Sequence, residues 1–264
     1  MTYEIKATAP SRPAATDLLD DWALLNIEMR SRFILGPDGR LMNENDPDRS
    51  PAPLMFMAGC QAGNLVSFSR EVDETTRAEI TDLALSEPPL AKRESTPRHL
   101  QRYIERLSKN GGASVSPGLS FHLPHGVQID GDASLVFSDS PEGARLLEDI
   151  DTQGMPPALV EIGFHGVEDL WAPWCLALQD GEVASLAFAA RLGSEGAELG
   201  LATSPPFRGR GLAAAATAGW TRHPDLAGRT LFYSTARTNL ASQRVVAKLG
   251  LRFIGATMGI SREA

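Results

Sequence analysis

The chain has 264 residues, enough for one large domain or two small ones at roughly 150 residues per domain. Its hydrophobic content of 42% and charged content of 22% are those of an ordinary globular protein and argue against global disorder. The formal net charge of −8 disfavours a surface for nucleic acid or anionic membranes.

The cysteines and the N-terminal sequence indicate the cellular compartment in which the protein is expected. Cys60 and Cys175 each lie in an apolar stretch, which predicts two buried, reduced thiols rather than a disulfide framework. The N-terminus has no basic segment followed by an apolar one, so no signal peptide is expected. No apolar run reaches the roughly 20 residues that span a bilayer. These features predict a soluble, cytoplasmic protein.

The first part of the chain alternates helical patterns with strands and loops. From it we expect a helix over 16–33 capped by Thr16 or Asp17, a loop over 36–53, a hairpin of 54–60 with 65–70, a helix from Asp73 to Pro88, and a helix over 99–108. Asn110-Gly111-Gly112 then signals a helix end and a linker. We therefore interpret residues 1–115 as an N-terminal α+β domain of unknown role.

After this linker the pattern changes to short strands and turns. We expect strands at 128–129, 135–137, 174–178, 183–191, 197–203, 230–236 and 251–258, with helices at 140–150, 211–221 and 239–249. Tight Asp-Gly and Gly-containing turns predict an antiparallel meander, and the strand–helix alternation after it predicts an α/β arrangement. The predicted fold class is therefore α/β (α+β), with a mixed, mostly antiparallel sheet flanked by helices.

A glycine-rich turn connects the strand at 197–203 to the helix at 211–221. Gly209 and Gly211 carry no side chains that would hold a phosphate away, and Arg208 and Arg210 add positive charge. The backbone N–H groups at the start of the helix point toward one place, with the positive end of the helix dipole behind them. This combination favours a pyrophosphate site over a simple connecting loop.

Two common phosphate-binding motifs fit this turn poorly. No G-x-x-x-x-G-K-[ST] string occurs in the chain, which excludes a P-loop. Residues 209–214 formally match the dinucleotide pattern G-x-G-x-x-A. That pattern requires an acidic residue about 20 positions later, at the end of the next strand. The strand at 230–236 is followed instead by Arg237-Thr238-Asn239.

Residues 208–213 resemble the Q/R-x-x-G-x-G/A signature of the GNAT (general-control-related N-acetyltransferase) superfamily. Residues 239–251 resemble its N-x-x-S-x-x-x-x-x-K-L-G-F/L segment, at the expected separation. The resemblance covers about 117–264 and is strongest over 174–258. It implies a GNAT acyl-CoA-binding catalytic domain at 117–264. Residues 1–115 resemble the extra domain of a subgroup of uncharacterised bacterial GNAT proteins.

The resemblance implies acetyl-CoA (CoA) as the cofactor, and no metal. The pantetheine arm would pair with backbone where two strands splay after a bulge near Leu201–Thr203, and an N–H near Leu201 would polarise the thioester carbonyl. On helix 239–249, Arg244 and Lys248 would approach the adenosine phosphate or form a solvated face. The implied cofactor-binding residues are Leu201, Ala202, Thr203, Phe207, Arg208, Gly209, Arg210, Gly211, Leu212, Ala213, Asn239 and Ser242, of which Asn239 also suits a helix cap.

The resemblance also suggests catalytic groups. Glu198 lies on the strand where several relatives place a general base, although a salt-bridged strand glutamate is the alternative. Many relatives place a tyrosine acid two residues before Lys-Leu-Gly, where this chain has Val246. Tyr233, Ser234 or water would then protonate the departing thiolate, which has a thiol pKa of about 8.5 and leaves readily.

Two further groups of residues suggest functional sites but also have simple structural explanations. His122 and His125 lack the additional ligands that a metal site needs, which favours loop histidines. Trp171 and Trp174 suit core packing or a wall of the acceptor site.

The predicted function is an N-acetyltransferase in which an amine of a small molecule or peptide attacks acyl-CoA directly. We expect no nucleic-acid or membrane partner, and a homodimer is compatible with the sequence. One alternative is a non-catalytic acyl-CoA-binding or regulatory module, which the missing tyrosine would suit. Another is an NAD-dependent oxidoreductase, against which the absent ribose-binding acid argues. One fold can serve many acceptors, so the fold does not choose among them.

Overall fold

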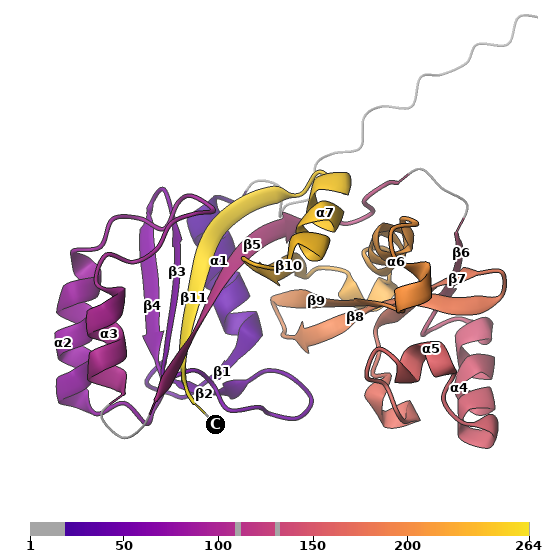
Figure 1. Ribbon diagram of the computed structural model, residues 1–264, viewed down its shortest axis with the longest axis horizontal. Helices are drawn as coiled ribbons and strands as arrows, with labels where there is room; N and C mark the ends of the chain where they lie inside the picture. Colours follow the sequence, from indigo (N-terminus) through magenta and orange to yellow (C-terminus); the bar gives the residue numbers. More distant parts are fainter. Residues whose placement is uncertain (1–18, 109–111, 130–132, 264) are drawn as a thin grey trace, which may run out of the picture.

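The computed structural model describes residues 19–108, 112–129 and 133–263 (Figure 1). Its strands are β1 (Phe33–Leu35), β2 (Leu41–Glu44), β3 (Met55–Cys60), β4 (Gly63–Phe68), β5 (Ala113–Leu123), β6 (Ser134–Phe137), β7 (Trp174–Gln179), β8 (Glu182–Leu192), β9 (Gly196–Thr203), β10 (Thr230–Ala236) and β11 (Arg252–Arg262). Its α-helices are α1 (Asp21–Arg32), α2 (Glu74–Leu85), α3 (Leu100–Leu107), α4 (Pro141–Gln153), α5 (Pro157–Val160), α6 (Leu212–Trp220) and α7 (Leu240–Lys248).

One nine-stranded sheet extends through the molecule in the order β4-β3-β11-β5-β10-β9-β8-β7-β6 (Figure 1). Within it, β9 and β10 form the parallel pair, and the other neighbours are antiparallel. A second, two-stranded sheet consists of β1 and β2. The mixed, mostly antiparallel sheet with flanking helices confirms the predicted fold class.

Strand β5 links the N-terminal part of the chain to the rest of the sheet. It lies between β10 and β11 and pairs antiparallel with both. The boundary expected at residues 115–117 therefore falls inside a strand that is paired on both sides. That residues 1–115 and 117–264 form separate domains stays a prediction.

Side-chain caps set the starts of several helices. Asp73 accepts the N–H of Thr76 at 2.9 Å at the start of α2. Ser140 accepts the N–H of Gly143 at 3.0 Å before α4, which has proline at its first position. Each of these satisfies a backbone donor that has no partner within the helix. The sequence predicted the first helix from a capping Asp73 and the second from Pro141 at its first position, and the structure confirms both helices.

Four sequence expectations need correction. The helix expected over 16–33 begins at Asp21 among the described residues, and its proposed caps at 16 and 17 lie outside them. The expected loop at 36–53 contains β2, which is paired with β1. Residues 128–129 form no strand. Strand β5 was not expected, because Pro117 and Gly118 at its centre are poor strand formers, yet neighbours on both sides hold it extended.

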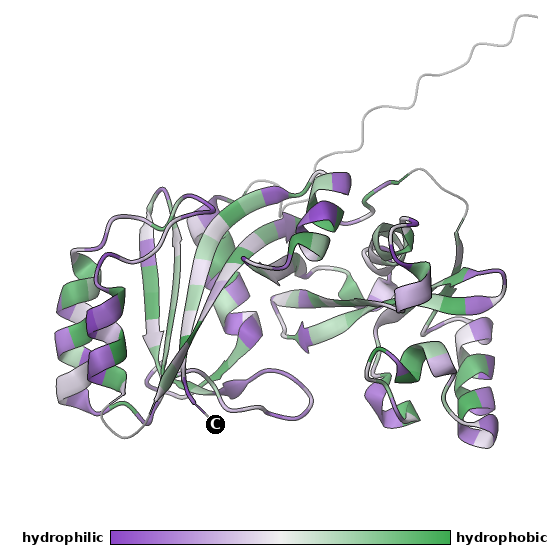
Figure 2. Cartoon of the chain, viewed as in Figure 1, coloured by the Kyte–Doolittle hydropathy of each residue, from purple (hydrophilic) through white to green (hydrophobic). Residues whose placement is uncertain are grey.

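Apolar side chains pack on both faces of the sheet. Figure 2 colours the strands and helices by the hydropathy of their residues. One face has a single core that includes Tyr103 of α3 and Trp220 of α6. The opposite face has two cores, one around Leu24 and Leu25 of α1 and one around Leu159 and Trp174 near α4 and α5. Helix α1 therefore lies on the face opposite α6.

Two further expectations can be compared with the structure. Both cysteines are free thiols and both are buried, as the sequence predicted. Among the residues that the structure describes, no helix combines the length and apolar character needed to cross a bilayer.

Candidate functional site

The parallel strands β9 and β10 pair over only a short stretch. Their register runs from Thr230 opposite Gly196 to Phe232 opposite Glu198. Beyond this point β9 pairs with β8 alone and β10 pairs with β5 alone. The sheet therefore opens between the two strands from Glu198 onward, close to where the sequence placed a splay. The accompanying bulge lies on β8, between Ala189 and Arg191, and not on β9 at 201–203.

A cavity of about 410 Å³ lies at this opening. Side chains that alternate along a strand point to opposite faces of the sheet. Phe232 packs against α1, so Ser234 shares that face, while Tyr233 packs in the core of the opposite face. Glu198 and Ser234 line the cavity from the α1 side, and Leu199 and Tyr233 line it from the other side. The cavity thus connects both faces of the sheet.

Glu198 is buried in this cavity, with 3% of its surface exposed, and it is ion-paired. Its Oε2 accepts a hydrogen bond from Nη1 of Arg191 at 3.1 Å, and its Oε1 accepts one from the hydroxyl of Ser234. Nη1 of Arg32 lies 4.0 Å from Oε1. Burial raises the pKa of the Glu198 carboxyl, but Arg32 and Arg191 outweigh it and hold the pKa below its ordinary value. Glu198 is therefore an ionised carboxylate.

A second buried carboxyl, Glu28 of α1, faces the same network. Its Oε1 accepts a hydrogen bond from the hydroxyl of Ser120 on β5 at 2.7 Å. Burial and then the charge of Glu198 raise the pKa of Glu28 to about 7. The two carboxyls therefore have pKa values shifted in opposite directions. Arg32 and Arg191 lower both values, but they outweigh burial only at Glu198, which accepts a hydrogen bond from Arg191.

Sequence reasoning missed most of this charged network. Arg32 ends α1, Arg191 lies on β8, and Glu44 lies on β2, where it pairs with Arg191. One signal was available. Glu28 and Arg32 are four residues apart, on the face of α1 whose apolar residues form the core, and buried charges are rare without a partner.

The glycine-rich turn leads into α6 as predicted. Gly211 is the N-cap in a left-handed conformation with φ +88°, and no side chain caps the helix. The first N–H groups of α6 therefore have no partner from a capping side chain and none within the helix. The guanidinium of Arg210 stacks over the ring of Phe207 at 5.7 Å, and Nε of Arg208 donates to the carbonyl of Thr203 at 3.2 Å.

A second cavity, of about 440 Å³, lies at this turn. Arg210, Gly211 and Leu212 line it, together with Lys248 from α7. The end of the Lys248 side chain is so close that a Cβ at Gly211 would lie 2.6 Å from its Nζ. Lys248 therefore adds positive charge to the turn. Arg244 of the same helix is exposed and does not line either of these two cavities.

Tyr233, one of the two candidate general acids, lies beside α7. The hydroxyl of Tyr233 lies 2.8 Å from Oγ of Ser242 on α7 and lines the cavity at the opening. Burial raises the pKa of the Tyr233 hydroxyl above its ordinary value. Val246 occupies the position of the expected tyrosine and is buried. Asn239 caps α7 by accepting the N–H of Ser242 at 3.0 Å, so its capping role is observed.

Residues 201–203 of β9 lie beside the opening. They pair with β8 on one side, which leaves the other backbone edge unpaired where β10 has separated. The ring of Phe188 fills the space beside Gly200, because it would lie 2.4 Å from a Cβ at that position.

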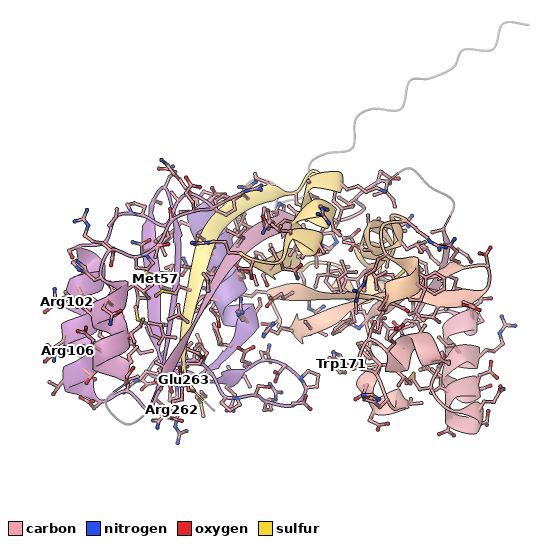
Figure 3. The ribbon with its side chains drawn as sticks, in the orientation of Figure 1. Met57, Arg102, Arg106, Trp171, Arg262 and Glu263 are labelled. Carbon is pink, nitrogen blue, oxygen red and sulfur yellow. The ribbon has the colours of Figure 1, made fainter. Side chains whose placement is uncertain are left out.

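The histidines and tryptophans considered as candidate site residues make packing and hydrogen-bond contacts. His122 is not a loop residue as expected but a buried residue of β5, whereas His125 lies in a turn, where its Nε2 is 2.7 Å from the carbonyl oxygen of Arg229. Within the described ranges, no three His, Cys, Asp or Glu side chains are arranged to hold a metal ion. Trp174 is in the core near α4. Trp171 packs edge-on against Phe188 at 5.6 Å, donates to the carbonyl of Ala189 and does not line the cavity at the opening. The side chain of Trp171 is labelled in Figure 3.

Comparison with known families agrees with the predicted resemblance. Residues 157–252 match the family model described as "Acetyltransferase (GNAT) domain". The match includes β9, the glycine-rich turn, α6, β10 and α7. The match confirms, over this region of the chain, the resemblance to GNAT acetyltransferases that the sequence predicted. No curated protein matches the chain.

Among solved structures, similar chains share a low sequence identity. A GNAT-family protein from Novosphingobium aromaticivorans is 21% identical with a TM-score of 0.38, over 57% of this chain and 66% of that chain, just under two thirds of its length. A GCN5-related N-acetyltransferase-like protein from Streptococcus suis is 18% identical with a TM-score of 0.44, over 83% and 86%. A GNAT-family acetyltransferase from Colwellia psychrerythraea is 16% identical with a TM-score of 0.41, over 92% and 96%.

Proposed function

We propose that the protein transfers an acetyl group from acetyl-CoA to the amine of a small molecule or peptide. The observation that carries this proposal is the cavity where β9 and β10 separate, because it joins the two faces of the sheet. A thioester can approach from the side of α6 and α7 while an amine approaches from the side of α1. The two reactants then meet at one point in a fixed orientation, which is a large part of what such a transfer requires.

The turn before α6 would hold the pyrophosphate of CoA. Its N–H groups lack a capping side chain, and Arg210 and Lys248 place positive charge beside them. The unpaired edge of β9 at 201–203 would bind the pantetheine arm in the manner of an added strand. Bound acetyl-CoA supplies an activated acyl group for attack by an amine.

Glu198 would receive the proton of the amine, directly or through one water. The free pKa of an alkyl amine is near 10, as for lysine, so the amine arrives protonated and must lose a proton before attack. Each oxygen of Glu198 already accepts one hydrogen bond, but an ionised carboxylate has about four acceptor sites. Its lowered pKa makes it a weak base. We therefore expect its contribution at the low end of the 10²–10⁴-fold range of general bases.

Tyr233 and Ser234 would have different tasks. The Tyr233 hydroxyl is on the α7 side, where it would donate a hydrogen bond to the departing sulfur. Ser234 is on the α1 side and donates to Glu198, so it would orient that carboxylate. Val246 has no donor to offer, which leaves Tyr233 as the hydroxyl placed for the leaving group.

Cofactor binding is tested with two matched glycine variants. Gly209 and Gly228 both have φ +78°, and a Cβ at either would meet nothing within 4 Å, so Gly209→Val and Gly228→Val introduce similar backbone strain. Acetyl-CoA should raise the melting temperature of the wild type and of Gly228→Val, since a ligand of the native state stabilises it by mass action. It should raise that of Gly209→Val much less. Equal shifts in both variants would place the phosphate site elsewhere.

Catalysis is tested separately from binding. Release of CoA thiol should accompany acetylation of an amine from a panel of amino acids, polyamines and peptides. Stabilisation by acetyl-CoA without any thiol release would favour the non-catalytic acyl-CoA-binding module. Stabilisation by NAD(H) and not by acetyl-CoA would favour the oxidoreductase and contradict the proposal.

A further inference from the structure

The α1 side of the cavity contains a guanidinium whose ion pair is long: Nη1 of Arg32 approaches Oε1 of Glu198 only to 4.0 Å. Arg32 is the last residue of α1 and lines the cavity. Its guanidinium carbon lies 5.7 Å from the ring centre of Phe33 and 5.4 Å from that of Phe56. Those two rings pack edge-to-face against each other with centres 4.9 Å apart. Contact with both rings favours this position of the guanidinium.

The hydrogen-bonding capacity of Arg32 is largely unused. Its Nε is buried and has no hydrogen-bond partner, and its nearest carboxylate contact is the 4.0 Å separation from Glu198. Among the described residues, its guanidinium donates no hydrogen bond that meets normal geometry. Nε of Arg191 is also without a partner, but its Nη atoms donate to both Glu44 and Glu198. A guanidinium has five N–H donors, and burying these donors without hydrogen-bond partners costs free energy.

We propose that Arg32 receives the carboxylate of the acceptor, which is therefore a free amino acid. This rests on the acyl transfer proposed above and narrows its acceptor. A guanidinium binds a carboxylate through two parallel hydrogen bonds, and the same cavity places Glu198 beside Arg32 for the amine. An amino acid carries both groups within a few ångströms of each other, as the short separation of Arg32 and Glu198 requires.

The charge balance of the cavity agrees with this acceptor. Its charged lining side chains are two arginines, Arg32 and Arg191, and two glutamates, Glu44 and Glu198. A zwitterion adds one charge of each sign and leaves this balance unchanged. A lysine side chain of a protein, or a polyamine, brings positive charge without a carboxylate next to the amine. A peptide N-terminus has its nearest carbonyl in a neutral amide. None of these would satisfy Arg32.

The test compares amino acids with their carboxamides in two enzymes. Wild type and Arg32→Met are assayed for CoA release with L-amino acids and with the matching L-amino acid amides, which keep the amine and lose the carboxylate. The ratio of kcat/KM for acid over amide is taken in each enzyme, so that the intrinsic reactivities of the two amines cancel between enzymes. We expect the ratio to fall about 10- to 100-fold in Arg32→Met, through a raised KM for the acid.

Controls separate this inference from the proposed function. Arg30→Met changes an exposed arginine of the same helix, paired with Glu195 at 2.7 Å, and should keep the wild-type ratio. If Arg32→Met does not fold, Arg32→Lys should still lower the ratio, because an ammonium cannot bind a carboxylate through a planar fork. An unchanged ratio in a folded Arg32 variant overturns the inference. So does wild-type acetylation of polyamines or peptide lysines at the rate of amino acids, with acyl transfer itself intact. Absence of transfer to every amine would instead overturn the proposed function.

Discussion

Replacing Glu28 with glutamine should make the protein more stable at neutral pH than the wild type. Glu28 is fully enclosed, and burial together with the charge of Glu198 raises its pKa from 4.5 to about 7. A glutamine has the shape of the protonated acid and can still accept the hydrogen bond from Ser120. The variant therefore avoids the cost of ionising a buried carboxyl and loses little else.

The size and direction of the effect follow from proton linkage. Between pH 4.5 and 7 the folded protein keeps a proton on Glu28 that the unfolded chain releases. Stability contributed by a raised pKa is complete below the unfolded pKa and is lost as pH rises through the folded pKa. With about 1.4 kcal/mol for each unit of pKa shift, wild type should lose about 3 kcal/mol relative to Glu28→Gln across this window. Glu198 has a lowered pKa, so its own contribution is lost at lower pH.

The measurement is urea unfolding of both proteins at pH values from 4 to 8. The difference in unfolding free energy between wild type and variant isolates Glu28, because other groups titrate in both. Glu148→Gln, at an exposed position on α4, is the control and should give a curve parallel to wild type. Parallel curves for Glu28→Gln would refute the reasoning, and so would a variant less stable than wild type at pH 8.

Two further predictions concern the reaction. Glu198→Gln should lower kcat about 10²-fold, and this loss should shrink at high pH, where the amine deprotonates unaided, while Glu195→Gln, at an exposed position, should match wild type. Steady-state rates from pH 6 to 10 measure the effect. A loss of kcat that does not change with pH would assign Glu198 a structural role alone. Tyr233→Phe should lower kcat but leave unchanged the rise in melting temperature that acetyl-CoA causes, because only the hydroxyl near Ser242 is removed. A variant with wild-type kcat would leave water as the proton donor.

Local signals in the sequence were sufficient for the cofactor side of the site. The strand, glycine-rich turn and helix at 197–221 are consecutive, so their spacing and turn chemistry define them without distant contacts. The same holds for β10 and α7, because Asn239 is an N-cap residue that marks the start of the helix. The resemblance to a known family then gave these local elements a chemical meaning.

The acceptor side could not be predicted in this way. Arg32, Glu44 and Arg191 come from α1, β2 and β8, and only tertiary packing brings them to Glu198. Glu198 itself was identified, but its burial and its ion pairs depend on that packing. Strand β5 was missed for a related reason. Its extended shape comes from β10 and β11 beside it, while Pro117 and Gly118 argue locally against a strand.

The position of β5 between β10 and β11 limits how the chain can be shortened. A fragment trimmed to residues 157–252 would lack this strand, and β10 would then present a bare edge of unpaired N–H and C=O groups. Such edges pair with other chains, so the fragment should aggregate rather than fold as a monomer. It would also lose Arg32 and Glu44 from the cavity. Work on the acetyltransferase domain therefore calls for the N-terminal residues in the same polypeptide.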